Sequence, residues 1–280
     1  MHKKFTVGQA ITMVLLLIIG LTLMYPLYWT ITRAFMANNE IFTNITGWIP
    51  DKWLFSNFID GWYAVGEYSF TRYYSNTLYV TMWVVIGATI SNSLVGFGFA
   101  RIRFKFRDVL FLIVLSVMML PSQVTMIPIY MIWSTLGFTN SFVPLFFGAF
   151  FSSPFYVFLY RQNMASIPGE LDEAATVDGC SILGIYWRII LPLSKPIVAT
   201  IMLFSFGEGF GDFFYPLIYL RDNSKKTVTL ALKSFMDAEG SSTWGPMLAM
   251  SLVAMIPGIV MFFISQRNMV NSMSTSGLKG

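Results

Sequence analysis

The stretch AITMVLLLIIGLTLMYPLYWTI, residues 10–31, contains no charged side chain and determines the class of fold that this chain can adopt. A helix rises about 1.5 Å per residue, so about 20 residues cross the hydrocarbon core of a bilayer, which is about 30 Å thick. The stretch is therefore predicted to be a membrane-spanning helix. Lys3 and Lys4 precede it, as they would precede a signal peptide, but the apolar run is long and no A-x-A-like cleavage site follows. We therefore expect an uncleaved anchor.

Five further apolar stretches follow the first one. They cover approximately residues 74–100, 109–132, 142–160, 197–220 and 247–265. Of the 280 residues 55% are apolar and 11% are charged, and the mean hydropathy of +0.63 is unusual for a soluble domain. We expect an all-α membrane protein with six transmembrane helices and a single transmembrane domain over residues 1–280. Small residues at helix-packing spacing, such as Asn92 and Gly96, predict close contacts between these helices.

Lysine and arginine residues indicate the orientation, because they are enriched in cytoplasmic connections. The turn RIRFKFR, residues 101–107, has four basic residues in seven. With this turn inside, eleven basic residues lie on the inner side and seven on the outer side. Both termini, the connection 161–195 and the tail 267–280 are therefore expected in the cytoplasm, and the connections 32–73 and 221–246 outside. The net charge of +4 is explained by orientation, and no nucleic-acid partner is expected.

The composition excludes most kinds of covalent and metal-dependent catalysis by this chain alone. The chain has one cysteine, Cys180, and one histidine, His2, so neither a His/Cys metal site nor a Ser-His-Asp triad can be assembled. No GxxxxGK[ST] phosphate loop occurs in the sequence. We expect a non-catalytic subunit that binds no metal or cofactor. If ATP drives it, ATP and Mg²⁺ must bind to a partner subunit.

The inner connection contains a short acidic segment, EAATVDG at residues 173–179. The acids from Glu170 onward suit the start of a helix, where the helix dipole favours negative charge. Asp178 and Gly179 predict the end of this helix, because glycine readily adopts the left-handed conformation. The segment SILGIYWRIIL then predicts a second, amphipathic helix that runs to Pro192. Such a connection is expected to lie along the membrane surface or to dock into a groove on a partner.

The segment EAATVDG, followed by Ile189, Leu191 and Pro192, resembles the EAA loop of permease subunits of binding-protein-dependent ABC importers. The similarity extends from about Tyr74 to the C-terminus, through SNTLYV, GFARIRFKFRD, LPSQVTMIPIY, SFGEGFGDFFYPLIYL and MVNSMSTSGLKG. These segments are similar to the carbohydrate branch of the family, especially the smaller maltose-type permease. The resemblance implies the type I importer fold and a place in a prokaryotic cell membrane.

The resemblance also implies what the inner connection does. In this family the helix of the loop docks into a cleft on a cytoplasmic ATPase, and closure of the ATPase dimer opens the permease outward. The matching residues and the C-terminal tail would contact the ATPase; they are Glu173, Ala174, Ala175, Asp178, Gly179, Leu191, Pro192, Leu278, Lys279 and Gly280. The implied partners are a second, related permease, two ATPase subunits and an external solute-binding protein.

The fifth apolar stretch carries two acids that mark a candidate solute pathway. Charges near the bilayer centre usually face a cavity or a partner. Glu208, Asp212, Tyr215 and Tyr219 are spaced to form one helical stripe, and acids beside aromatic rings suit a polyhydroxy solute. Gln123, in a stretch bracketed by two prolines, is a further candidate. A structural role, through bonds to a neighbouring helix or accommodation of a kink, is the alternative for Glu208, Asp212 and Gln123.

The same stretch departs from the pattern of the family. The usual run W-N-D-F-L-W-P-L is matched at Asp212, Pro216 and Leu217, whereas Phe210 and Gly211 replace tryptophan and asparagine. The leading hypothesis is a permease subunit of an ATP-driven sugar or oligosaccharide importer that works by alternating access. One alternative is an ABC permease for another solute, such as a glycerol phosphoester. The other is an ion-coupled secondary transporter that uses both acids of the stripe.

Overall fold

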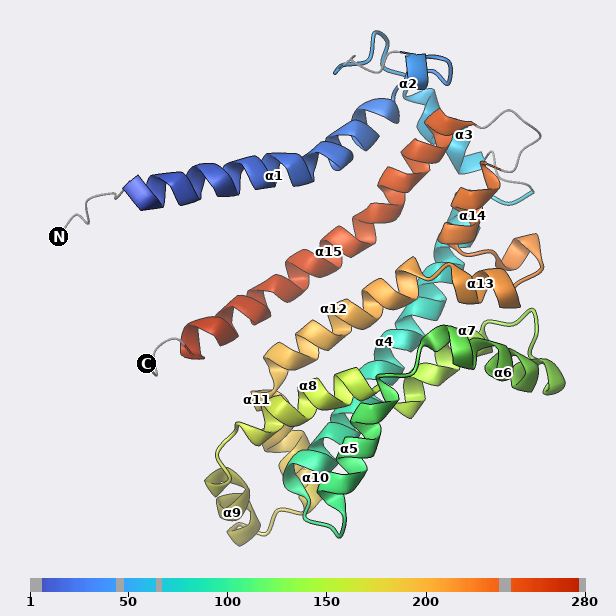
Figure 1. Ribbon diagram of the computed structural model, residues 1–280. Helices are drawn as coiled ribbons and strands as arrows, with labels where there is room; N and C mark the ends of the chain where they lie inside the picture. Colours follow the sequence, from blue (N-terminus) through green and yellow to red (C-terminus); the bar gives the residue numbers. More distant parts are fainter. Residues whose placement is uncertain (1–6, 44–47, 64–66, 237–242, 277–280) are drawn as a thin grey trace. The chain divides into compact units, whose positions relative to one another are not determined.

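The computed structural model describes residues 7–43, 48–63, 67–236 and 243–276, with side chains described up to residue 266 (Figure 1). All regular structure in these ranges is helical. The helices are, in chain order, α1 (Val7–Arg33), α2 (Glu40–Thr43), α3 (Ser56–Tyr63), α4 (Phe70–Arg101), α5 (Arg107–Val117), α6 (Ser122–Thr135), α7 (Val143–Phe146), the 3-10 helix η1 (Phe147–Phe151), α8 (Pro154–Ala165), α9 (Glu170–Val177), α10 (Ile182–Ile185), the π-helix η2 (Tyr186–Ile190), α11 (Leu191–Leu193), α12 (Lys195–Gly211), α13 (Phe214–Tyr219), the 3-10 helix η3 (Asn223–Lys225), α14 (Val228–Ser234) and α15 (Trp244–Ser276).

Five helical runs in the described residues are long and apolar enough to cross a membrane. They are Val7–Arg33, Phe70–Arg101, Val143–Ala165, Lys195–Tyr219 and Trp244–Gln266. The pair α5 and α6 makes a sixth span if the two helices are taken together. The expected all-α membrane fold is therefore confirmed.

The third expected span, residues 109–132, is wrong as a single helix. It consists of α5 and α6, which meet at a bend of 93°. Pro121 precedes α6 with an extended backbone (φ −61°, ψ 130°), and its missing N–H cannot continue the hydrogen bonds of α5. Pro128 lies inside α6 without ending it. Of the two prolines in this stretch, Pro121 therefore marks the break.

The fifth span also contains a break that the sequence did not predict. α12 ends at Gly211, Asp212 is extended (φ −63°, ψ 128°), and α13 begins at Phe214. The hydroxyl of Thr229 donates to the carbonyl oxygen of Asp212 at 2.7 Å, so an acceptor released by the break finds a partner. The expected single stripe from Glu208 to Tyr219 is consequently wrong, because its members lie on two helices.

The chain divides into two compact units. Unit 1 comprises Met1–Thr71 and Ala231–Ile256, and unit 2 comprises Arg72–Leu230 and Pro257–Gly280. In unit 1 the amide of Asn57 donates to the carbonyl oxygens of Ala34 and Met36, at 2.9 Å each, and thereby fixes α3 to the end of α1. The most apolar part of α1 is not buried by the rest of the chain. The single domain expected over residues 1–280 stays a prediction.

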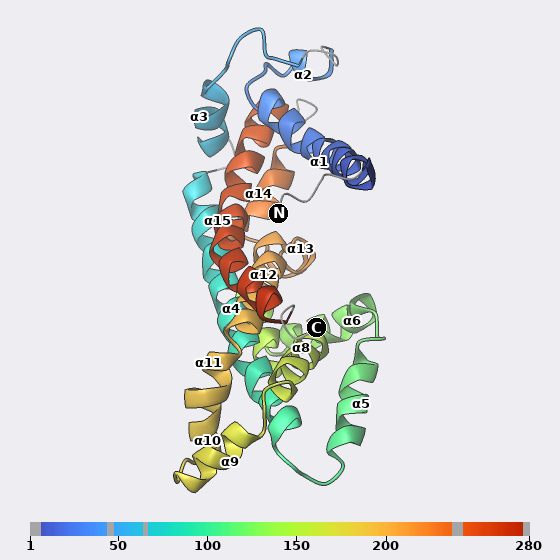
Figure 2. The same ribbon diagram turned by 90° about the vertical axis from the view of Figure 1, so that its left-hand side faces the viewer.

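Unit 2 is built along α4. Figures 1 and 2 show α8 and α12 beside this helix, with α9 and α10 near its C-terminal end. A hydrophobic cluster joins these elements; its buried members are Ala88, Phe97, Tyr156, Tyr160, Met164, Ala175, Ile185, Tyr186, Ile190 and Ile201. A Cβ atom on Gly96 would lie 2.4 Å from the Cβ of Tyr160, so only glycine permits this approach of α4 to α8. The close contact expected from the spacing of small residues is confirmed at Gly96.

Replacement of Gly96 by alanine is expected to destabilise the protein by about 1–3 kcal/mol, because α8 must move to make room for the new methyl group. Gly98 is the matched control, since a Cβ there meets no atom within 4 Å. Gly98→Ala should leave the stability unchanged or raise it by up to about 1 kcal/mol through helix propensity. Thermal unfolding of the two purified variants measures the difference. Equal stability would contradict the proposed close packing.

Candidate functional site

The helix α9 ends in a Schellman motif at Gly179. The N–H of Cys180 donates to the carbonyl oxygen of Ala175 at 2.9 Å, and the N–H of Gly179 donates to that of Thr176 at 3.0 Å. Gly179 has a φ of +81°, in the left-handed region that this cap requires and that residues with a side chain rarely adopt. The short acidic helix and its glycine stop, both expected from the sequence, are confirmed.

The two alanines of α9 have different surroundings. Ala175 is 5% exposed and belongs to the hydrophobic cluster of unit 2, so it holds α9 on the chain's own core. Ala174 and its neighbour Glu173 are exposed. The resemblance assigned both alanines to contact with an ATPase subunit. In this structure only Ala174 is available for such a contact.

Arg101, the last residue of α4, fixes the start of α9. Its guanidinium donates to the carbonyl oxygen of Ile167 at 2.7 Å and lies 3.4 Å from the carboxylate of Asp172. The two side chains of this ion pair are only 10% and 24% exposed, so solvent screens the pair less than it screens surface pairs. α9 is thereby attached to the longest helix of unit 2. From the sequence, Arg101 was assigned only an orienting role within the basic turn, because a partner so distant in the chain cannot be read from local spacing.

The second helix of the loop forms as expected, but its exposed side is largely apolar apart from Arg188, so the expected amphipathic character is not confirmed. The hydroxyl of Ser181 caps α10 by accepting from the N–H of Gly184 at 3.1 Å, and α10, η2 and α11 continue to Leu193. On the inner side the hydroxyl groups of Tyr186 and Ser93 are 2.7 Å apart. The helix also exposes large apolar side chains, and together with the end of α9 they are named the apolar loop surface: Val177, Ile182, Leu183 and Trp187. Leu191 is half-buried and Pro192 is exposed.

A pocket of about 180 Å³ lies between α6 and the break after α12. Its lining includes three of the predicted pathway residues, Gln123, Asp212 and Tyr215, beside Ser122 and Phe214. The carboxylate of Asp212 accepts from the N–H of Tyr215 at 3.3 Å, which orients the acid at the pocket wall. An amide, a carboxylate and aromatic rings are therefore brought together from two segments that are distant in the sequence.

Tyr219 and Glu208 lie in other positions. The ring of Tyr219 stacks on that of Tyr215, with their centroids 6.4 Å apart, and supports the pocket wall from behind. Glu208 is exposed on α12. The broken helix thus separates Glu208 from the pocket that Asp212 borders.

Part of the expected site falls outside the described residues. Leu278, Lys279 and Gly280, which the resemblance assigned to contact with an ATPase, belong to this part. Among the residues that the structure does describe, no group of three His, Cys, Asp or Glu side chains could hold a metal ion.

Most of the chain matches known proteins. Residues 92–274 match the family described as binding-protein-dependent transport system inner membrane component. The diacetylchitobiose uptake system permease protein DasC of Streptomyces coelicolor is 30% identical over 279 residues, which cover 99% of this chain and 100% of that protein. The sn-glycerol-3-phosphate transport system permease protein UgpE of Yersinia pestis is 28% identical over 267 residues, which cover 94% of this chain and 95% of that protein.

The fold also matches a solved structure. It is a chain in the crystal structure of a bacterial ABC transporter involved in the import of the acidic polysaccharide alginate. The TM-score is 0.80 at 22% sequence identity, and the match covers 93% of this chain and 96% of that chain. At this identity the likeness shows the fold alone.

Replacement of Arg101 by methionine is expected to release the start of α9. The variant loses the ion pair with Asp172 and the bond to Ile167, so the amides of α9 should exchange about tenfold faster, which corresponds to about 1.4 kcal/mol of local opening. Hydrogen–deuterium exchange of the peptide that contains α9 measures this. Arg103→Met, in the same basic turn but exposed, is the control and should leave exchange in α9 unchanged. Equal exchange in both variants would contradict the attachment.

Proposed function

The chain belongs to the family of inner membrane components of binding-protein-dependent transport systems, and we propose that it is the membrane-spanning subunit of an ATP-driven importer for a sugar or oligosaccharide. The observation that carries the proposal is the construction of the loop of α9 and α10. It is anchored to the core through Ala175 and Arg101, and it presents an exposed acidic and apolar surface. A loop of this kind suits the transfer of motion from a partner to the membrane helices.

The coupling partner in this proposal is a cytoplasmic ATPase subunit. Glu173 and Ala174 would contact it, together with the apolar loop surface, while Gly179 keeps the turn between α9 and α10. The four large apolar side chains of that surface favour burial on a partner, because each gains about 1.5–3 kcal/mol when it is fully buried. ATP and Mg²⁺ would bind to the ATPase. This chain would provide the pathway for the solute and would catalyse no reaction.

The pocket supports a sugar as the solute. The carboxylate of Asp212 accepts hydrogen bonds from hydroxyl groups, the amide of Gln123 donates and accepts them, and the ring of Tyr215 can cover the C–H face of a sugar. A glycerol phosphoester is less well matched, because its anionic phosphate would be repelled by Asp212 in a medium of low polarity. An ion-coupled carrier that uses Glu208 and Asp212 as one site is not favoured, since only Asp212 borders the pocket.

The complete importer would contain three other kinds of subunit. They are a second, related permease, two copies of the ATPase and an external solute-binding protein. The exposed apolar helix α1 is available to lipid and to the second permease. Both termini and the loop of α9 and α10 would lie in the cytoplasm of a bacterial cell. Solute delivered by the binding protein would enter when ATP binding turns the permease outward, and hydrolysis would reset it.

The coupling role predicts that Glu173→Ala and Gly179→Pro disrupt coupling. The first removes an exposed acid from the contact, and the second places a residue with a fixed negative φ where the chain has +81°. Both variants should lose co-purification of the ATPase subunit or solute-stimulated ATP hydrolysis by about tenfold or more, as expected for the loss of an interface hot spot. Glu170→Ala, also exposed on α9 but outside the EAA segment, is the control.

This experiment also tests the rival class of function. Gradient-driven uptake by the chain alone, unchanged by Glu173→Ala and Gly179→Pro, would refute the importer. A carbohydrate panel screened for stimulated ATP hydrolysis of the purified complex identifies the solute.

Glu208 gives a separate prediction for the pathway. Glu208 lies outside the pocket that Asp212 borders, so Glu208→Gln tests whether the solute also passes this part of α12. If it does, the variant changes solute-stimulated ATP hydrolysis or uptake by about tenfold while assembly stays intact, because a charged hydrogen bond along the path is lost. Tyr156→Phe is the matched control, since it removes a buried hydroxyl of α8, the helix that packs against α12. If Tyr156→Phe reproduces the effect, or if assembly is lost, the role of Glu208 is structural.

A further inference from the structure

The helix α6 forms one wall of the pocket, yet none of its side chains is buried in the described part of the chain. Partly exposed rings, such as Trp133 on Phe147 with the centroids 5.3 Å apart, pack it on unit 2, and its position depends further on its two ends. One end is the 93° bend from α5. The other end leads through Gly137, which has a positive φ, to Asn140. Between the ends, the ring of Tyr130 packs on that of Tyr219, with the centroids 5.5 Å apart.

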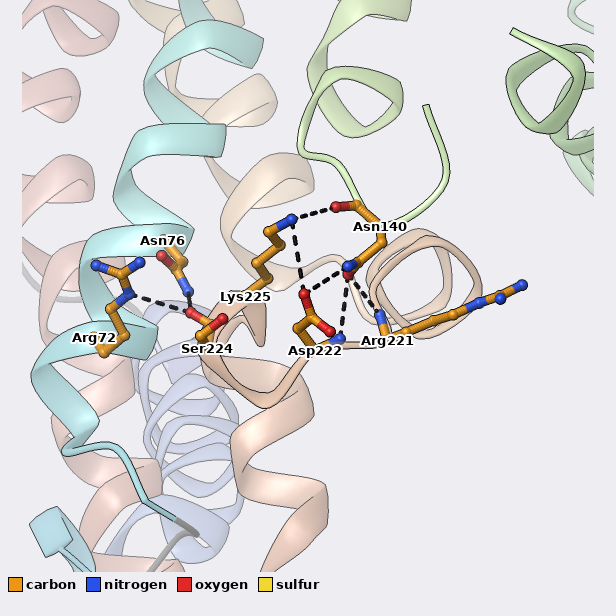
Figure 3. A network of polar contacts seen from close by, with 7 residues as sticks. All are labelled: Arg72, Asn76, Asn140, Arg221, Asp222, Ser224 and Lys225. Carbon is orange, nitrogen blue, oxygen red and sulfur yellow. Dashed lines mark hydrogen bonds and ion pairs between the residues drawn. The ribbon is translucent and has the colours of Figure 1, made fainter. Parts of the chain in front are cut away.

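Asn140 uses every polar group of its backbone and side chain to hold this second end (Figure 3). Its N–H donates to the carbonyl oxygen of Tyr219 at 2.7 Å, and its carbonyl oxygen accepts from Nζ of Lys225 at 2.7 Å. Its Oδ1 accepts from the N–H groups of Arg221 and Asp222, at 3.1 and 3.2 Å. Its Nδ2 donates to Oδ2 of Asp222 at 2.6 Å. Asn140 therefore ties the corner after α6 directly to the segment that follows α13.

That segment is in turn fixed to α4. The amide of Asn76 donates to the carbonyl oxygens of Ser224 and Lys226, at 2.9 Å each, and Nε of Arg72 donates to Ser224 at 3.2 Å (Figure 3). Asn76 is only 6% exposed, so these bonds are shielded from water. The corner at Asn140 is thus held, through residues 221–226, on the central helix of unit 2.

We propose that Asn140 is a positioning residue of the solute pathway, which keeps the α6 wall that carries Gln123 at a fixed distance from the α13 wall that carries Tyr215. The inference rests on the proposed function, because it takes the pocket to be the pathway. Asparagine suits the position for two reasons. Its backbone is in the left-handed region, with a φ of +61°, where asparagine and aspartate are enriched. Its amide donates through Nδ2 and accepts through Oδ1. An ionised carboxylate only accepts, and a hydroxyl must donate and accept at a single atom.

The test measures the distance between the two walls. Spin labels are attached to cysteines at Ile127 on α6 and Leu217 on α13, both exposed, in the full-length chain in lipid nanodiscs with Cys180→Ser. Asn140→Gly removes the side-chain bonds and retains the left-handed backbone without strain. It should broaden the distance distribution about twofold, because α6 then samples more than one position. Asn223→Ala, an exposed asparagine on the same segment, is the matched control and should leave the distribution unchanged.

A double variant that exchanges the side chains of Asn140 and Asp222 distinguishes a positioning role from a general loss of structure. In Asn140→Asp the new acid faces Asp222, and the two carboxylates repel each other. In the double variant Asn140→Asp with Asp222→Asn the amide donates in the opposite direction, and the acid at 140 can still accept from the backbone and pair with Lys225. The double variant should restore the narrow distribution. A distribution that stays narrow in Asn140→Gly, or that stays broad in the double variant, overturns the proposal.

Uptake of the sugar identified by the panel completes the test in the reconstituted transporter. Asn140→Gly should reduce uptake by about tenfold, and the double variant should recover it. If the walls separate and uptake is unchanged, the pocket geometry is irrelevant to transport and the proposal is overturned. A wild-type transporter without ATP-driven sugar uptake would instead refute the proposed function, while the distance measurement would still report on Asn140.

Discussion

Within a bilayer each backbone N–H and C=O group must find a partner in the protein, and this constraint explains how unit 2 can contain broken helices. The break before α8 follows Ser152, which has a positive φ, and the N–H of Ser153 donates to Oδ1 of Asn92 at 2.6 Å. Asn92 is 1% exposed and also donates to its own helix, so it serves α4 and the break together. At the break after α12, the hydroxyl of Thr229 likewise donates a hydrogen bond, here to the backbone carbonyl oxygen of Asp212. Polar side chains of neighbouring segments therefore replace the missing helical hydrogen bonds.

The breaks in turn create the candidate pathway. A straight helix over residues 197–220 would place Glu208, Asp212 and Tyr215 on one stripe. The extended residue at 212 turns α13 away and leaves Asp212 and Tyr215 beside Gln123. The 93° bend between α5 and α6 has a similar effect. It turns α6 away from the axis of α5 and brings the first turn of α6 to the pocket. The helices are thus interrupted at two places, and a pocket lined by both polar and apolar side chains forms between them.

What the sequence predicted correctly depends on short-range or averaged properties. Hydropathy over about 20 residues identified the spans, and the acid-rich start and Gly179 identified α9, because a helix cap is a local event. The predictions failed where the outcome depends on distant contacts. The break at Asp212 requires Thr229, and the burial of Ala175 beside the exposed Ala174 depends on which face of α9 meets the core. Arg101 was identified only as part of a basic turn, since its bond to Ile167 joins segments far apart in the chain.

The helix α4 joins the two parts of the candidate machinery within unit 2. At its C-terminal end Arg101 holds α9, and near its other end Asn76 holds the segment to which the corner after α6 is bound. Between Asn76 and Arg101 the helix covers about 38 Å at 1.5 Å per residue, and Gly96 and Asn92 fix it to α8 and its preceding break in this interval. A partner that displaces α9 would therefore act on a stiff element, because moving one end of a helix without the other requires its hydrogen bonds to open. Coupling between α9 and the pocket needs no long chain of side-chain contacts in this arrangement. It needs the two polar attachments at the ends of α4 and the unbroken helix between them.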